Sequence, residues 1–366
     1  MTSLLASLPA ASGSSFLLVW SLVALACGLD RLVGDPHGWL HPVQVMGGCI
    51  ARLRGWAEAW AGDRPWALRV AGAGLTLLLV LGSAAAGWLV ERLAMLCPAL
   101  GLPLLLIGLA SALAAGSLRR AVRRVLEALP DLALARSRLA WIVGRDVTGL
   151  REAEILRAAA ETASENAVDG LFAPLFWMLL GALLWGWTLR TGSAIAWPGP
   201  PLPAALTPAW LVPGPLALAW AFKAASTLDS MLGYRRGRLR WLGTAGARLD
   251  DVLTWLPCRL VALSLPLAAG RPACTLPWLR AALREGAPDP SPNAGVSQAA
   301  YAHAAGVRLG GVNRYADGLR AKPLLAAACP PADRPGVERM LTLSDRLELL
   351  WLLISGALVM LLTRRA

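Results

Sequence analysis

Charged residues are scarce in this chain. Of its 366 residues only 16% are Asp, Glu, Lys or Arg, whereas 56% are hydrophobic, and the mean hydropathy is +0.54. A soluble protein of this length would have about a quarter of its residues charged. Apolar runs long enough to cross about 30 Å of hydrocarbon recur along the chain. The composition therefore argues against a soluble globular protein and predicts an integral membrane protein.

Lysine, tyrosine and histidine are also rare, while arginine and tryptophan are abundant. Of 35 basic residues only Lys223 and Lys322 are lysine, and the formal net charge is +12. The arginines lie between the apolar runs, as the positive-inside rule predicts for cytoplasmic loops. The 17 tryptophans against three tyrosines are typical of membrane-interface anchors. No nucleic-acid partner is expected, because its binding needs basic residues gathered on a soluble face.

Several motifs that would assign a chemistry at once are missing. The six cysteines form no CxxC pair and no ligand spacing, so neither a disulfide framework nor a zinc site is expected. No GxxxxGK is present, which excludes a Walker loop. No internal repeat of the kind seen in many transporters is found. The first apolar run lacks a basic n-region and a cleavage site, so we predict a retained first helix.

The apolar runs predict an all-α fold, a polytopic membrane helical bundle of about 6–7 segments. These segments cover residues 15–29, 67–89, 100–116, 171–189, 210–225, 251–269 and 347–362. Pro257 and Arg259 interrupt the sixth segment, so we expect it to be re-entrant or broken near Pro257. Such breaks are tolerated where the backbone lines a protein cavity.

We interpret residues 1–366 as a single integral membrane domain with two polar segments. Residues 117–170 begin with an arginine cluster and are predicted to form a cytoplasmic helical segment carrying an acidic motif. Residues 271–346 hold Ser291-Pro292-Asn293-Ala294-Gly295 and Gly310-Gly311-Val312-Asn313. Glycine-rich turns of this kind can form anion-binding backbone nests, although each alone is more often an ordinary turn.

Four carboxylates precede the fourth apolar segment. Glu154, Glu161, Glu165 and Asp169 fall within an arc of about 80° on one helix face. Because like charges repel, a divalent cation or a set of arginines should lie opposite. A solvated acidic face is the plain alternative, but ionisable groups that adjoin a membrane segment are costly and usually functional.

Further polar residues lie at the predicted ends of the spans on one face of the membrane. Acids, arginines and asparagines that converge there predict a site for magnesium and phosphate, with helix caps and interfacial ion pairs as the alternative. The residues are Asp30, Asp35, His41, Arg145, Asp146, Glu161, Glu165, Asp169, Lys223, Asp229, Arg235, Asp250, Asp251, Arg259, Asn293 and Asn313.

A set of motifs, in one order from about residue 20 to the C-terminus, resembles the adenosylcobinamide-phosphate synthase family (CobD/CbiB) of cobalamin biosynthesis. The acidic motif is highly specific, whereas the Gly-Asp-Pro turn alone would be weak. The motifs are Gly34-Asp35-Pro36 with His41-Pro42, Glu161-Thr162-Ala163-Ser164-Glu165-Asn166 with Asp169-Gly170, Ser226-Thr227-Leu228-Asp229-Ser230-Met231 with Gly233-Tyr234-Arg235, Ala247-Arg248-Leu249-Asp250-Asp251, Ser291-Pro292-Asn293-Ala294-Gly295, and Arg308-Leu309-Gly310-Gly311.

The resemblance implies a multi-pass enzyme of the cell inner membrane with a cytoplasmic active face. It would join adenosylcobyric acid to (R)-1-amino-2-propanol or its O-phosphate through an amide bond, using ATP and Mg²⁺. Membrane lipid would surround it, and it would form a homo-oligomer or associate with later corrinoid-assembly enzymes. A carboxylate is a poor electrophile, so ATP is expected to convert it to an acyl phosphate before the amine attacks.

Roles for individual residues follow as expectations from this resemblance and from their chemistry. Catalytic carboxylates are expected at Glu161, Glu165, Asp169 and Asp229. Metal ligands are expected at Glu161, Glu165, Asp250 and Asp251. Substrate and phosphate contacts are expected at Asp35, His41, Arg145, Asn166, Lys223, Ser226, Tyr234, Arg235, Arg259, Asn293 and Asn313.

The sequence departs from the family pattern at two places. Arg240-Trp241-Leu242 stands where aromatics usually follow Gly-Tyr-Arg, and Val296-Ser297-Gln298 stands where Trp and then Ser-Glu are expected. Gln298 in place of an acid argues against a charge-dependent role at that position. The rival interpretations are a membrane prenyltransferase, which usually has two aspartate-rich motifs, and a non-catalytic membrane sensor or a transporter.

Overall fold

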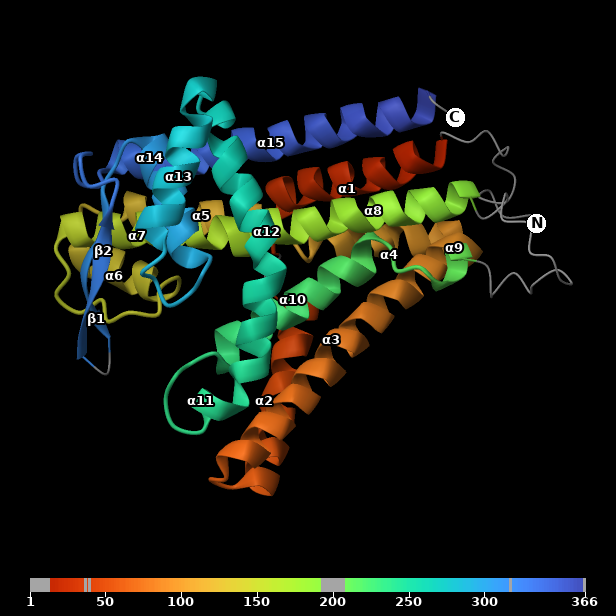
Figure 1. Ribbon diagram of the computed structural model, residues 1–366, viewed down its shortest axis with the longest axis horizontal. Coiled ribbons are helices and arrows are strands. Elements are labelled where there is room, and N and C mark those ends of the chain that lie inside the picture. The colour runs from red at the N-terminus through yellow and green to blue at the C-terminus, as the bar shows by residue number, and fades with distance from the viewer. Residues whose placement is uncertain (1–13, 36–37, 39–40, 192–207, 316–317, 365–366) are drawn as a thin grey trace, which may run out of the picture. The chain divides into compact units, whose positions relative to one another are not determined.

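The computed structural model describes residues 14–35, 38, 41–191, 208–315 and 318–364, and it is 77% helical (Figure 1). This confirms the predicted all-α class. The helices are α1 (Ser14–Val33), α2 (Pro42–Ala61), α3 (Pro65–Leu96), α4 (Pro98–Ala110), α5 (Ala115–Glu127), α6 (Leu132–Ala140), α7 (Glu152–Ala167), the π-helix η1 (Val168–Phe172), α8 (Ala173–Thr191), α9 (Pro208–Leu211), α10 (Pro215–Leu232), α11 (Leu239–Leu242), α12 (Thr244–Ala268), the 3-10 helix η3 (Pro272–Cys274), α13 (Thr275–Gly286), α14 (Ala294–Ala305) and α15 (Arg334–Arg364). The strands are β1 (Leu309–Tyr315) and β2 (Gly318–Leu325).

Six helical stretches of the described chain are long and apolar enough to cross a membrane. They are Ser15–Val33, Pro65–Leu96, Pro98–Glu127, Glu152–Leu189, Thr244–Ala268 and Arg334–Arg364. Each contains one of the apolar segments expected from the sequence. The protein is therefore a multi-pass membrane protein.

Two expectations about the spans need correction. The run at 210–225 is not among the six: α10, which holds most of it, contains Lys223 and Asp229, and these charges lower its mean hydropathy. The expected break near Pro257 is wrong, since α12 continues unbroken for 25 residues through both Pro257 and Pro266. Proline removes one backbone hydrogen bond, which a helix in a membrane protein can tolerate when other groups satisfy the freed carbonyl.

The chain folds into two compact units, each built from separate stretches of sequence. Unit 1 comprises residues 1–114, 174–250 and 352–366, and unit 2 comprises residues 115–173 and 251–351.

In unit 1, α2, α3 and α10 pack against one another around an apolar core that includes Ile50, Leu75 and Leu228 (Figure 1). The start of α10 is fixed by Glu91 of α3, whose carboxylate is fully buried. It accepts backbone N–H groups at 2.8–3.0 Å from the first turn of α10 and the residue before it, from Gly214, Leu216 and Ala217. An acidic group at a helix N-terminus satisfies donors that have no partner inside the helix.

In unit 2, α7 contacts α5, α6, α14 and the hairpin β1–β2. The two strands are antiparallel, with Gly311 opposite Lys322, Asn313 opposite Arg320, and an irregularity between Leu309 and Gly311. After α7 the chain continues into the π-helix η1, which contains Asp169. A π-turn holds one more residue than an α-turn, so Asp169 is displaced from the phase that an unbroken α-helix would give it.

Candidate functional site

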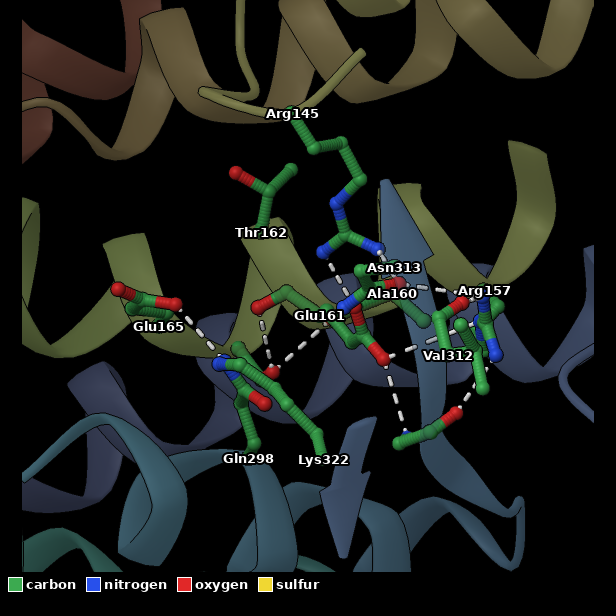
Figure 2. A network of polar contacts seen from close by, with 12 residues as sticks. Arg145, Arg157, Ala160, Glu161, Thr162, Glu165, Gln298, Val312, Asn313 and Lys322 are labelled. Carbon is green, nitrogen blue, oxygen red and sulfur yellow. Dashed lines mark hydrogen bonds and ion pairs between the residues drawn. The ribbon is translucent and has the colours of Figure 1, made fainter. Parts of the chain in front are cut away.

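Glu161 lies at the centre of a polar network in unit 2 (Figure 2). Its side chain projects from α7 and is 1% exposed. Its Oε2 forms an ion pair with the guanidinium of Arg145, from the loop before α7. Its Oε1 accepts the backbone N–H of Gly310 at 3.0 Å, and Arg157 Nε lies 4.0 Å away. The buried charge is therefore compensated by two arginines and a backbone donor, as a buried carboxylate requires.

Asn313 of β1 connects the same two arginines. Its Oδ1 accepts from Arg145 Nη1 at 2.8 Å and from Arg157 Nη2 at 3.1 Å. Arg157 also donates to the carbonyl oxygens of Gly310 and Val312 at 2.7 and 2.8 Å. Asn313 is 3% exposed, and its Nδ2 is a buried donor with no hydrogen-bond partner. The network thus joins α7 to the hairpin and leaves two buried N–H donors, Asn313 Nδ2 and Arg157 Nε, without a hydrogen-bond partner.

The approach of β1 to α7 depends on two glycines with positive φ, Gly310 at 84° and Gly311 at 100°. A Cβ on Gly310 would lie 1.9 Å from the carbonyl oxygen of Pro323, and one on Gly311 would lie 2.6 Å from Arg157 Nη1. Only glycine adopts these angles without strain and leaves room for those atoms. The Gly-Gly pair therefore lets the backbone reach Glu161 and Arg157.

Glu165, one helical turn after Glu161, belongs to a second group of contacts. Its Oε2 accepts from Nε2 of Gln298 on α14 at 2.7 Å. Gln298 is 2% exposed, and its Oε1 is a buried acceptor with no hydrogen-bond partner. Lys322 of β2 donates to Asp289 at 2.9 Å. Burial lowers the pKa of Lys322, but the carboxylates of Asp289 and Glu165 outweigh burial, and the net pKa lies above its ordinary value.

A third group surrounds the start of α14. Asn293, 5% exposed, donates to the carbonyl oxygen of Asp251 at 2.9 Å and accepts from Arg259 Nη1 at 2.5 Å. Arg259 also donates to the carbonyl oxygen of Pro292 at 2.8 Å and lies over the ring of Trp255. Ser291, the remaining polar residue of this turn, lies 3.4 Å from Asp251 Oδ1. Arg259 and Asn293 therefore fix this turn.

Ten of the predicted site residues belong to unit 2, and three of these, Arg145, Glu161 and Asn313, share one network. Asp146 instead accepts the backbone N–H of Thr148 in the loop before α7. Asn166 donates to Thr162 within α7, and Asp169 is half-buried in η1. The other four, Glu165, Asp251, Arg259 and Asn293, take part in the second and third groups. Glu154, also part of the predicted acidic stripe, instead accepts the backbone N–H of Arg151 at the helix start.

The remaining predicted residues belong to unit 1. His41 Nε2 lies 3.2 Å from Asp35 Oδ1, while Nδ1 accepts the N–H of Val43 and begins α2. Of that predicted turn, Pro36 lies outside the described residues. Tyr234 and Arg235 are exposed after the end of α10. Five of the predicted residues in unit 1 are half-buried: His41 at the start of α2, Lys223, Ser226 and Asp229 on α10, and Asp250 on α12.

Among the described residues, no group of three or more His, Cys, Asp or Glu side chains is placed to hold a metal ion. Both oxygens of Glu161 already have partners in Arg145 and Gly310. These residues therefore do not form a metal cage of their own, and the four expected ligands stay a prediction.

Four side chains of the network were not predicted as site residues: Arg157, Asp289, Gln298 and Lys322. Arg157 stands four residues before Glu161, the spacing that pairs charges along a helix. Lys322 is one of only two lysines in a chain otherwise using arginine. The spacing could have identified Arg157 from the sequence, and the rarity of lysine could have identified Lys322. Gln298 and Asp289 become recognisable only once α14 is packed against α7 and the hairpin.

A family model and several curated relatives match this chain over most of its length, and all carry the names CobD or CbiB. A family model described as CobD/Cbib protein matches residues 23–344. The chain is 40% identical over 336 residues to cobalamin biosynthesis protein CobD of Synechocystis sp., covering 91% of this chain and 89% of that protein. It is 36% identical over 348 residues to CobD of Pelobacter propionicus (93% and 96%) and 35% identical over 357 residues to CbiB of Salmonella typhimurium (95% and 97%). No solved structure matches.

Proposed function

Because the chain belongs to the CobD/CbiB family, we propose that it is a cobalamin-biosynthesis enzyme that forms an amide bond. Its substrates would be the carboxylate of adenosylcobyric acid and the amine of (R)-1-amino-2-propanol or its O-phosphate, with ATP as co-substrate. The product would be adenosylcobinamide or its phosphate. The names of the relatives support the pathway, and the chemistry of unit 2 supports the reaction class.

The observation that carries this proposal is the buried network of Arg145, Glu161 and Asn313. Arg145 pairs with the carboxylate of Glu161 and donates to the amide oxygen of Asn313. Asn313 Nδ2 is a buried N–H without an acceptor. Buried polar groups in proteins are nearly always hydrogen-bonded. An oxygen of an anionic substrate or intermediate would satisfy this donor, and fixed donors of this kind stabilise charge that develops during acyl transfer.

The reaction would run in two balanced steps. The corrinoid carboxylate attacks the terminal phosphorus of ATP, so that an acyl phosphate forms and ADP leaves. The amine, after losing one proton from its ammonium form, attacks the acyl carbon, and inorganic phosphate leaves with its bonding electron pair. Glu165 is our choice for the carboxylate that takes this proton, since its hydrogen bond comes from the neutral amide of Gln298, whereas Glu161 is paired with arginine. Asp169 and Asp229 stay proposals for the same class of role.

The basic residues proposed to bind phosphate fall into two groups, those with hydrogen-bond partners in unit 2 and those in unit 1. Arg145 and Arg259 already use their forked donors on Glu161, Asn313, Asn293 and Pro292. If they also bind phosphate, as we propose, they do so with their remaining N–H groups. Lys223 and Arg235 of unit 1 remain proposed phosphate contacts. The further proposed substrate contacts are Asp35, His41, Asn166, Ser226, Tyr234, Asn293 and Asn313.

Magnesium enters the proposal as the companion of the nucleotide. This ion usually binds through substrate phosphates with only one or two carboxylates, which does not require the three-carboxylate cage that the described residues lack. We further propose the cell inner membrane as the location and the cytoplasm as the side of the active face, because ATP is supplied there and α5 is rich in arginine.

The test is a reconstituted reaction of the purified full-length protein. Adenosylcobyric acid, ATP, Mg²⁺ and either aminopropanol or its phosphate are mixed, and the corrinoid is analysed by mass spectrometry. The proposal expects a product of the amide mass that disappears when ATP or the amine is omitted, together with stoichiometric ADP and phosphate. A folded preparation that gives no amide with either amine would contradict it and favour a non-catalytic membrane sensor.

A further inference from the structure

Gln298 carries an unusual feature for a buried side chain. It lies on α14 with 2% exposure, and its carbonyl oxygen Oε1 has no hydrogen-bond partner. Its Nε2 donates to Glu165 at 2.7 Å (Figure 2). Most buried polar atoms in proteins have a partner, and an exception calls for an explanation such as a missing ligand or water molecule.

The hydrogen bond to Glu165 fixes which end of the Gln298 amide lacks a partner. The structure places the NH₂ end of Gln298 against Glu165 Oε2 and the carbonyl end away from it, which is the orientation that suits a carboxylate accepting a hydrogen bond. The unsatisfied atom is therefore an acceptor, and the group that completes it must be a donor.

The surroundings on the other packed elements also favour a cationic donor. Glu165 comes from α7 and Asp289 from the loop between α13 and α14, and Lys322 of β2 is bonded to Asp289 and lies in the field of both acids. Glu161, one turn earlier on α7, is already paired with arginine. An ammonium group has three N–H donors and no acceptor, so it complements a carbonyl oxygen beside a carboxylate.

We propose that Gln298 Oε1 and Glu165 form the binding subsite for the ammonium group of the amine substrate, which rests on the function proposed above. Gln298 would accept one N–H of the ammonium, and Glu165 would accept a second and then remove a proton. This role needs a neutral acceptor and no charge, so the amide at a position where an acid is expected is compatible with it. Gln298 also orients Glu165 by donating to its Oε2, which leaves Oε1 of that carboxylate for the substrate.

The first test measures binding without catalysis. Aminopropanol and, as a matched ligand without an amine, 1,2-propanediol are titrated into the full-length protein in detergent with no nucleotide present. Binding is read by calorimetry or saturation-transfer NMR. We expect the amine to bind and the diol to bind at least tenfold more weakly. Equal affinities would overturn the proposal, because the subsite would not be recognising an ammonium group.

The second test uses variants whose thermal unfolding is compared with the parent. Gln298→Met, which removes the carbonyl, should weaken amine binding at least tenfold and raise the KM for the amine without a matching rise for the corrinoid. Ser297→Ala, the neighbouring position on α14, should leave both unchanged. Unaltered amine affinity in Gln298→Met means that Oε1 is satisfied by a water molecule only, and it overturns the proposal.

A second variant keeps the proposal falsifiable if Gln298→Met does not fold. Gln298→Glu retains acceptor oxygens at this position, so amine affinity should stay within threefold of the parent or increase, and a tenfold loss would contradict the subsite. The outcomes also separate the two proposals. Amine binding that depends on Gln298 without amide formation overturns the proposed reaction alone. Amide formation with an unchanged amine KM in both variants overturns the subsite alone.

Discussion

Arg145 and Glu161 form an ion pair that is almost completely withdrawn from solvent, with side-chain exposures of 10% and 1%. Sixteen residues separate them in sequence, and the pair joins the loop before α7 to the helix itself. Removing one partner of a buried pair leaves an uncompensated charge, which is far more costly than losing a surface pair.

Glu161→Gln should therefore destabilise unit 2 strongly. The substitution keeps the shape of the side chain but leaves Arg145 and Arg157 without a counter-charge, and we expect a loss of about 3 kcal/mol or more. Denaturant unfolding in detergent, followed by circular dichroism, measures this. The matched control is Glu152→Gln, an exposed position on the same helix, which should change stability by less than about 0.5 kcal/mol. Similar effects of the two substitutions would contradict the buried-pair account.

Gly310→Ala should separate the hairpin from α7. Alanine is strained at this positive φ, and its Cβ would clash with the carbonyl oxygen of Pro323. If the strand moves away, the Glu161 carboxylate loses the hydrogen bond from the backbone N–H of residue 310. Gly306→Ala is the control, since Gly306 also has positive φ (68°) but nothing within 4 Å of a Cβ. The control should lose only the strain of about 1 kcal/mol, and Gly310→Ala clearly more. Hydrogen exchange of β1 amides locates the effect, and equal losses would argue against a steric requirement.

Alkaline pH should destabilise unit 2 through two groups outside the spans. Burial raises the pKa of Tyr301 despite its hydrogen bond to Ser344, and the acids around Lys322 raise the pKa of that residue. A pKa raised on folding means that the stabilisation is complete below the unfolded pKa, about 10 for both, and is lost as pH rises through the folded pKa.

The melting temperature of the protein should therefore be nearly constant from pH 8 to 9.5 and fall above pH 10. Tyr301→Phe cannot form a phenolate, so its melting temperature should fall less steeply above pH 10, although it starts lower for lack of the bond to Ser344. An identical pH slope in Tyr301→Phe and the parent would show that Tyr301 takes no part in the loss.

Arg259→Lys tests whether the forked geometry of the guanidinium holds the turn before α14. Arginine reaches both Asn293 Oδ1 and the carbonyl oxygen of Pro292, whereas an ammonium group at the same place cannot reproduce the planar fork. We expect a loss of about 1–2 kcal/mol and faster exchange of amides in the first turn of α14. Arg248→Lys, exposed on the same helix α12, should have little effect. Unchanged exchange in Arg259→Lys would assign the turn to other contacts.

Much of the helical architecture could be predicted from the sequence, because long apolar runs leave little choice of structure in a membrane. Glu161 next to a membrane segment requires a counter-charge, for which the sequence allowed either a divalent cation or arginines, and Arg145 and Arg157 lie there. The outcome at Pro257 could not be predicted from local chemistry alone: the residue breaks isolated helices, yet α12 continues through it.

The hairpin and the π-turn depend on tertiary packing. The strand β1 contains Gly310 and Gly311, which are poor strand formers, and it is held by Arg157 and Glu161 from a helix some 150 residues earlier. Gln298 is the clearest case. Its identity argued against a charge-dependent role, while its position against Glu165 is visible only when α14 and α7 are packed together.

The most direct measurement of the central claim is amide formation by Glu165→Gln in single-turnover reactions, compared with Glu152→Gln. Both variants change a carboxylate to an amide on α7, but only Glu165 contacts Gln298 in unit 2. If Glu165 removes the proton from the attacking amine, its variant should lose about 100-fold or more in rate, and the control should stay within about twofold. A folded Glu165→Gln protein that forms the amide at the parental rate would contradict the assignment of the chemistry to this network.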